Sequence, residues 1–247
     1  PVMPIQAAKA LSGVTKLGES SRRIAALIRP CEARAAVELF KLGQVDLDNV
    51  LLISVDCPGA MPLSAWINDP KGVEERFSPV LKENPDDSIR QICRICDRFS
   101  STGAEDLHIG TLGAKSDTVL LIPNSPKGEA VLECVGLAAG EDSSAWMSAV
   151  KQLTEARARK RKEAHGALQS EGTGLDELLH VLSKCINCHN CKRVCPICYC
   201  QQCFFDSSQI KLPFEDYLNR SEKAGALRLP PETFNFHIGR MLHMSLS

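Results

Sequence analysis

The segment between residues 185 and 203 constrains this chain most, because it holds seven of the twelve cysteines. Its first part has the spacing C-x2-C-x2-C-x3-C-P, which is typical of bacterial-type iron–sulfur clusters. The short gaps let the backbone wrap around a cubane, and Pro196 then turns the chain away because its fixed φ and missing N–H oppose a helix. The segment therefore predicts iron–sulfur binding, with these candidate ligands: Cys185, Cys188, Cys191, Cys195, Cys198, Cys200 and Cys203.

Zinc and disulfides are the alternatives for these thiols. Zinc usually takes two C-x2-C pairs separated by a long spacer, whereas the pairs here overlap. Disulfide frameworks are typical of short secreted chains, and this chain is long and has no signal-peptide pattern. The iron–sulfur interpretation is favoured. Within it, the fourth cysteine either completes the first cluster or binds a second one, and the last three thiols either serve that second centre or stay free.

Composition argues against several classes of protein. A net charge of −1 and an aromatic content of 5% give no support for nucleic-acid binding. No apolar run approaches the roughly 20 residues that a transmembrane helix needs. Abundant cysteine without a secretory signal predicts a reducing compartment, with the cytoplasm as the default. There is also no G-x-G-x-x-G fingerprint and no P-loop, so neither a Rossmann site of that type nor a Walker site is predicted.

Apolar runs and helix-like segments alternate in the first half of the chain. Residues 24–28, 50–55 and 118–122 are expected to be strands, whereas 33–42 and 88–97 are expected to be helices. This alternation predicts an α/β domain over residues 1–142, with a mixed sheet and flanking helices.

Residues 143–174 have a helical pattern and become strongly basic, so we expect a helical linker. Its basic side chains are either a solvated helix face or a docking surface for an acidic partner. A small helical, ferredoxin-like iron–sulfur segment is expected over residues 175–247. It finishes in an amphipathic helix without a cap, which predicts that more chain follows Ser247.

Four further cysteines, Cys31, Cys57, Cys93 and Cys96, lie near predicted strand ends or form a C-x2-C pair. Strand-end turns of an open α/β sheet meet at one edge, so these thiols either converge on another cluster or are small buried side chains. The helix N-terminus beside Cys31 predicts a lowered thiol pKa. Cys134 lies in an apolar stretch and is expected in the core.

Around these cysteines stand the runs R-P-C-E-A-R at 29–34, D-C-P-G at 56–59, C-R-I-C-D-R-F at 93–99 and I-G-T-L-G at 109–113. With them, residues 20–140 resemble the beta subunits of coenzyme F420 hydrogenases and dehydrogenases, including formate dehydrogenase beta subunits. The resemblance implies an α/β domain that binds FAD next to a [4Fe-4S] cluster, with the four cysteines above as cluster ligands. In this family the flavin exchanges a hydride with the deazaflavin coenzyme F420 and single electrons with clusters.

The loop after residue 109 holds the candidate flavin contacts, namely Gly110, Thr111, Gly113, Lys115 and Ser116. Glycines let a backbone approach a cofactor, and Lys or Ser can meet phosphate or ring oxygens. A plain surface turn is the alternative.

The chain as a whole is expected to be an electron-transfer subunit of a cytoplasmic oxidoreductase complex, with FAD and two or more [4Fe-4S] clusters. No selenocysteine, molybdopterin or nickel motif occurs, so the catalytic dehydrogenase or hydrogenase site is expected on a partner subunit. The alternative is a flavin-free iron–sulfur relay or scaffold subunit.

Overall fold

The computed structural model describes residues 1–80, 88–114, 118–137, 140, 142–171, 174–186, 188–200, 203, 213–225 and 236–242. The chain divides into two compact units, Pro1–Gly166 and Ala167–Ser247. The boundary between them falls inside the segment 143–174 that the sequence predicts as a linker.

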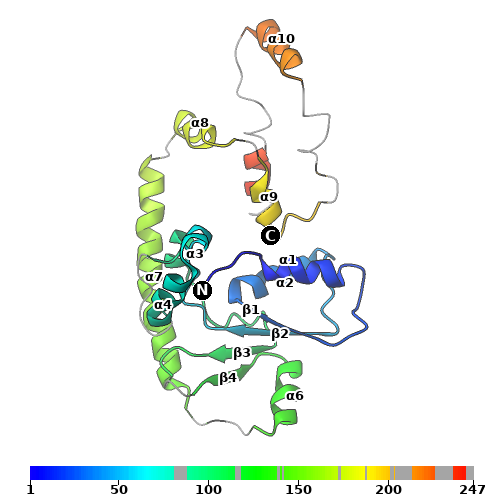
Figure 1. Cartoon of the computed structure of the whole chain (residues 1–247), viewed down its shortest axis with the longest axis vertical. Helices are drawn as coiled ribbons and strands as arrows, with labels where there is room; N and C mark the ends of the chain where they lie inside the picture. Colours follow the sequence, from blue (N-terminus) through cyan, green and yellow to red (C-terminus); the bar gives the residue numbers. More distant parts are fainter. Residues whose placement is uncertain are drawn as a thin grey trace. The chain divides into compact units, whose positions relative to one another are not determined.

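The first unit is built on a mixed four-stranded sheet, as predicted. Its strands are β1 (Ile24–Ile28), β2 (Val50–Val55), β3 (Leu107–Gly110) and β4 (Leu120–Pro123). They lie in this order across the sheet (Figure 1). β1, β2 and β3 are parallel, whereas β4 runs antiparallel to β3. The strand expected at 118–122 begins two residues later, and β3 was not predicted.

Three helices accompany the sheet: α1 (Ala7–Thr15), α2 (Pro30–Lys41) and α6 (Pro126–Val135). α1 packs on α2, and α6 packs against β4. α2 begins three residues before the predicted start at residue 33. Pro30 suits the first helical turn, where an N–H has no partner, and the Glu32 carboxylate accepts hydrogen bonds from the backbone N–H groups of Arg29 and Ala7. The same carboxylate therefore ties the start of α1 to the start of α2.

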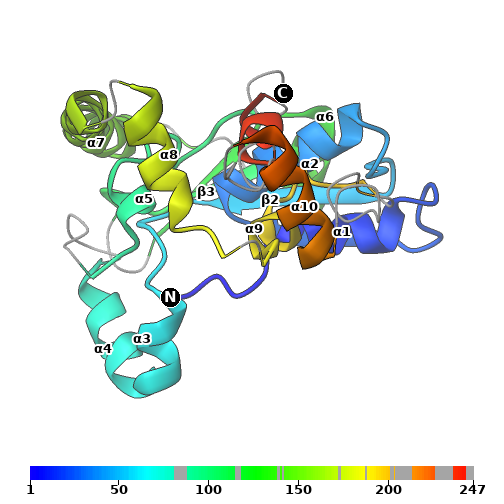
Figure 2. The ribbon, with the colours of Figure 1, turned by 90° about the horizontal axis from the view of Figure 1, so that it is seen from above.

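α3 (Leu63–Asn68) and α4 (Pro70–Val80) stand to one side of the sheet (Figure 2). Here a small core forms from Met61, Val73 and Ile89, against which Cys93 packs. The helix expected at 88–97 is wrong in extent, because α5 covers only Gln91–Arg94. Beyond it the Cys96 N–H donates to the Cys93 carbonyl at 3.3 Å, which closes a tight turn instead of a further helical turn.

α7 (Ser144–Glu171) confirms the helix expected across the basic segment. The second unit contains α8 (Leu175–Ser183), α9 (Asn190–Val194) and α10 (Phe214–Ala224), and residues 236–242 are also helical. It is thus helical and rich in cysteine as expected, while its ferredoxin-like fold stays a prediction. None of the helices in the described ranges is both long and apolar enough to cross a bilayer.

Candidate cofactor sites

Four cysteines from three separate segments of the first unit line one cavity of 160 Å³. Cys31 is the second residue of α2, and Cys57 follows β2. Cys93 lies in α5, and Cys96 lies in the turn after it. Because β1 and β2 are parallel neighbours, the turns after them meet at the same sheet edge. The structure therefore brings together the four thiols that the sequence suggested as one ligand set.

This cavity, called the thiol cavity below, has cationic walls. Besides the cysteines, its lining includes four arginines, and no aspartate or glutamate of the described residues belongs to it. The arginines are Arg29, Arg90, Arg98 and Arg157. Such a cavity is suited to an anionic group. Several thiolates in one cavity would repel one another, and the four guanidinium groups offset that negative charge.

Two of these thiols, Cys31 and Cys57, have raised pKa values. Burial and the neighbouring Cys57 thiolate raise the pKa of Cys31 to about 12, although part of its side chain is open to solvent. Burial also raises the pKa of Cys57, against the Gly59 N–H that stabilises its thiolate. The lowered pKa that the helix N-terminus predicts for Cys31 is therefore wrong, because burial and like charges outweigh the helix dipole. Cationic iron within the cavity would reverse this balance.

The number of thiols around the cavity can be compared with what a cluster and a single ion require. Among the described residues, no three His, Cys, Asp or Glu side chains are close enough together to hold one metal ion. Tetrahedral zinc needs four sulfurs at about 2.3 Å from one point. A cubane instead carries one iron at each of four corners and takes one thiolate per corner. Four cysteines around one cavity match the number of thiolates that a [4Fe-4S] cluster takes.

Arg157 reaches the thiol cavity from α7, where the sequence allowed a solvated basic face. That interpretation is wrong for this residue, since only 2% of Arg157 is exposed. Its guanidinium donates to the carbonyls of Cys96 (3.2 Å) and Pro58 (2.7 Å) and lies 4.5 Å from the centre of the Phe99 ring. Its third nitrogen, Nε, is buried without a hydrogen-bond partner. One turn further along α7, Arg161 pairs with Asp97 in a more exposed position.

A larger cavity of 610 Å³, called the β2–β3 cavity below, opens at the carboxyl ends of β2 and β3. Its volume lies in the range typical of small-molecule sites. Much of its wall is apolar, and it shares three residues with the thiol cavity: Arg29, Cys57 and Gly59. The two cavities are therefore neighbours on either side of the turn that follows β2.

The predicted flavin contacts fall partly on this wall. Thr111 and Gly113 line the β2–β3 cavity. Gly110 does not, and a Cβ there would lie 2.7 Å from Nε1 of Trp146. The space at Gly110 is thus taken by an indole of α7. Lys115 and Ser116 lie outside the described residues. Binding of flavin by these residues stays a prediction.

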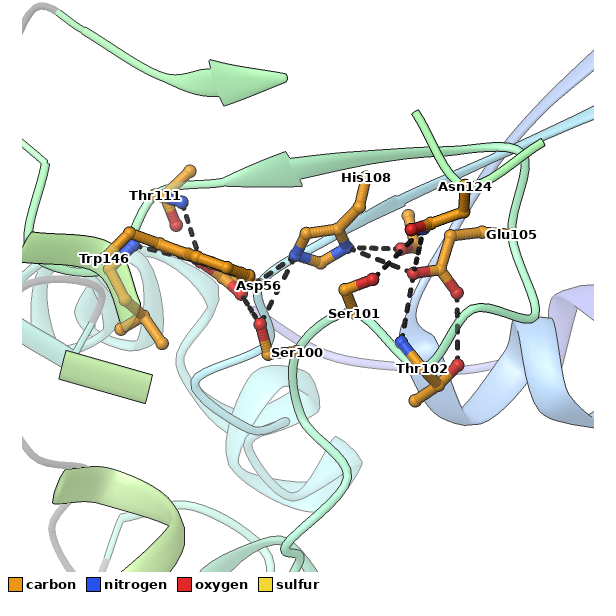
Figure 3. Close-up of polar contacts among 11 residues, drawn as sticks. Asp56, Ser100, Ser101, Thr102, Glu105, His108, Thr111, Asn124 and Trp146 are labelled. Carbon is orange, nitrogen blue, oxygen red and sulfur yellow. Dashed lines mark hydrogen bonds and ion pairs between the residues drawn. The ribbon is translucent and has the colours of Figure 1, made fainter. Parts of the chain in front are cut away.

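Asp56, which also lines the β2–β3 cavity, is the centre of a buried polar network (Figure 3). Only 4% of it is exposed. Five donors surround its two oxygens: Ser100 Oγ, His108 Nε2 (3.0 Å), Thr111 N (2.7 Å), Leu112 N (3.0 Å) and Trp146 Nε1 (2.9 Å). Burial opposes ionisation of this carboxyl, but the hydrogen bonds outweigh it and hold the pKa of Asp56 below its ordinary value.

The network continues on the other side of His108, which is fully buried in β3. Nδ1 of His108 lies 2.6 Å from Ser54 Oγ and 3.6 Å from a carboxylate oxygen of Glu105 (Figure 3). Glu105 in turn accepts hydrogen bonds from Thr102 and Asn124. Sequence reasoning missed this network, because Asp56 and Ser54 meet His108 only through the pairing of β2 with β3, which no local pattern marks.

The cysteine-rich segment of the second unit packs against the helix at 236–242. Cys191 lies in α9, Cys195 ends it, and the Cys198 N–H donates to the Cys195 carbonyl at 3.3 Å. Burial opposes the charge of Arg240, yet the thiolates of these three cysteines raise its pKa. The basic side chain of Arg240 therefore faces the cysteine-rich segment. Phe236, next to it on the same helix, stacks on His189 with ring centres 4.5 Å apart.

One cysteine prediction is wrong. Cys134, expected in the core, is exposed on α6. Its apolar neighbours in sequence are distributed around a surface helix, so the apolar run did not indicate burial. None of the twelve cysteines, all of which belong to the described residues, forms a disulfide in this structure.

No family model matches the chain. It is 26% identical over 270 aligned positions to the F420-dependent formate dehydrogenase 1 subunit beta of Methanococcus maripaludis. This alignment covers 95% of the present chain and 66% of the relative. The chain is also 26% identical over 261 positions to the F420-dependent formate dehydrogenase subunit beta of Methanocaldococcus jannaschii, covering 92% and 65%. The chain thus spans just under two thirds of the length of these curated relatives. This similarity confirms the resemblance to formate dehydrogenase beta subunits that the cysteine motifs predict.

Proposed function

We propose that this chain is an electron-transfer subunit of a multi-subunit oxidoreductase, in which electrons pass between a flavin and [4Fe-4S] clusters. The observation that carries the proposal is the common wall of the two cavities. Arg29, Cys57 and Gly59 belong to both, so groups held in them would be separated by little more than one turn of backbone.

The thiol cavity is the proposed site of the first cluster, with Cys31, Cys57, Cys93 and Cys96 as ligands. Two features support this assignment: one thiol for each corner of a cubane and four arginines in the lining. A cluster with four thiolates carries net negative charge, and the guanidinium groups offset it.

The β2–β3 cavity is the proposed flavin site. A flavin there would take up a hydride and pass its electrons on singly. The chain supplies apolar side chains to the cavity wall, among them Val55, Phe77 and Val119. Arg29, held by the Val2 carbonyl at 3.0 Å, offers a fixed cation for an anionic part of the ligand. Asp56 already engages the N–H groups of Thr111 and Leu112, so these two amides position the loop and are not free to bind the flavin.

The cysteine-rich segment is the proposed site of at least one further cluster, which would extend the electron path. Both relatives are named as subunits of F420-dependent formate dehydrogenases. By this likeness we propose a deazaflavin as the hydride partner and a separate catalytic subunit for formate or a related substrate. Because exposed thiols must stay reduced to bind iron, we place the protein in the cytoplasm.

Anaerobic purification followed by iron, acid-labile sulfide and flavin analysis tests the proposal. We expect all three in the wild-type chain. Changing Cys93 and Cys96 together to Ser should remove one paramagnetic species and about four irons, the content of one [4Fe-4S] cluster, and leave a second species. Iron and sulfide without flavin would favour the flavin-free relay. Zinc in place of iron would refute both the flavin-dependent electron-transfer function and the flavin-free relay.

A further inference from the structure

The strongest unexplained feature of the first unit is a buried positive charge without an acidic partner. Arg157 is 2% exposed, and its two hydrogen bonds go to neutral carbonyls, those of Cys96 and Pro58. Within the described ranges it forms no ion pair with a carboxylate, and its Nε has no hydrogen-bond partner. Burying an unpaired charge is costly, so this site is complete only when an anion lies beside it.

The surroundings of Arg157 indicate where that anion belongs. Arg157 lines the thiol cavity. The negative charges of the Cys96, Cys57 and Cys93 thiolates favour its protonated form, against the effect of burial. Phe99 covers one side of the guanidinium at 4.5 Å and shields it from water. Arg157 and the four cysteines thus line the same cavity.

We propose that Arg157 is the buried counter-cation of the four-cysteine site, which raises the reduction potential of the cluster bound there and holds two of its ligand loops at a fixed spacing. The proposal rests on the proposed function, because it requires a cluster in the thiol cavity. Net charge near a cluster is one of the properties that set its potential. A cation stabilises the reduced form, which carries one more negative charge, and it does so more strongly where solvent does not screen it.

The positioning part of the proposal follows from the same two hydrogen bonds. Pro58 is next to Cys57, and the other carbonyl belongs to Cys96 itself. One guanidinium therefore bridges the turn after β2 and the turn after α5, which lie far apart in sequence. Its planar fork can hold both carbonyls at once, whereas a lysine ammonium supplies the same charge without that geometry.

The test is a redox titration of the full chain, monitored by electron paramagnetic resonance under anaerobic conditions. The signal of this site is the one that disappears in Cys93→Ser. We expect Arg157→Gln to shift its potential to more negative values and Arg157→Lys to leave it close to wild type. Arg161→Gln is the matched control, because it removes a positive charge from the same helix. That charge is 44% exposed and paired with Asp97, so little shift is expected.

Three results would overturn the inference. These are an unchanged potential in Arg157→Gln with full iron content, the same shift in Arg161→Gln, or an equal shift in Arg157→Lys. If Arg157→Gln fails to retain iron, Arg157→Lys decides. Retained iron with a near wild-type potential supports the role of the charge, whereas lost iron shows that the two hydrogen bonds and not the charge keep the cluster, which overturns the charge part of the inference. If the wild-type chain contains no iron and sulfide that depend on Cys93, the proposed function itself is refuted.

Discussion

Replacing Asp56 by Asn should loosen the wall of the β2–β3 cavity without removing a cavity-filling side chain. Oδ2 of Asp56 accepts three N–H groups, from Thr111, Leu112 and Trp146. Oδ1 accepts Ser100 and lies beside His108. An Asn side chain at this position should direct its oxygen toward the three N–H groups, because these groups can only donate hydrogen bonds. Its amide nitrogen then faces the Ser100 hydroxyl, which can turn.

The size of the effect follows from the number of bonds that lose a charged acceptor. Three of the five bonds change from charge-assisted to neutral, at a loss of about 1 kcal/mol each, and Ser100 and His108 must reorient to accept from the new amide nitrogen. The amide is easier to bury than the carboxylate, and this recovers part of the loss, so we expect a net destabilisation of about 2 kcal/mol. For a chain of this size that corresponds to a melting temperature lower by about 4–8 °C.

Thermal unfolding of the cluster-free chain, followed by circular dichroism, measures this difference. Asp97→Asn is the matched control, because Asp97 pairs only with the partly exposed Arg161 and its loss should cost at most about 1 kcal/mol. Equal melting temperatures for the Asp56 and Asp97 variants would show that the five donors do not stabilise the fold as argued.

The pH dependence provides an independent check on the same residue. The folded-state pKa of Asp56 is depressed. Its stabilising contribution is therefore complete above the ordinary carboxyl value of about 3.9 and is lost as the pH falls through the folded value. The stability gap between wild type and Asp56→Asn should persist at neutral pH and close in more acidic solution. A gap that stays constant down to acid would contradict the assignment of a buried ionised carboxylate.

Two further variants test the second cluster and the packing of α7. Cys188→Ser should abolish one paramagnetic species and lower the iron content by several atoms per chain, whereas Cys134→Ser, on the surface of α6, should change neither. Gly110→Ala would place a Cβ 2.7 Å from Nε1 of Trp146 and should cost about 1–3 kcal/mol. Gly166→Ala, with open space around it inside α7, should instead stabilise by up to about 1 kcal/mol, and equal effects would refute the packing argument.

The sheet could be predicted where local sequence determined it. Residues 24–28 and 50–55 are apolar runs of strand length, and both became strands with the expected bounds. β3 was not predicted because it is only four residues long and places a histidine in the core. Its stability comes from pairing with β2 and β4 and from the Asp56 network, and a short window of sequence contains neither.

The convergence of the four cysteines was more predictable than the charge around them. Cysteine spacing and strand-end turns suggested that Cys31, Cys57, Cys93 and Cys96 converge, and they line one cavity. The charge around them was not predictable. Arg157 stands in a run of basic residues, and nothing in that run distinguishes it from its exposed neighbours. Its burial depends on Phe99 and on two carbonyls of distant loops.

The helical period explains how α7 acts on both cavities. Trp146 and Arg157 are eleven residues apart, which is close to three full turns, so both project from the same face of the helix about 16 Å apart along its axis. Trp146 anchors that face to Asp56 beside the β2–β3 cavity, and Arg157 anchors it to the ligand loops of the thiol cavity. Asp56 and Cys57 are adjacent in sequence, in the turn that follows β2. The helix is therefore attached to this turn at two points. A displacement of α7 would therefore disturb the loop beside the proposed flavin and the charge beside the proposed cluster together.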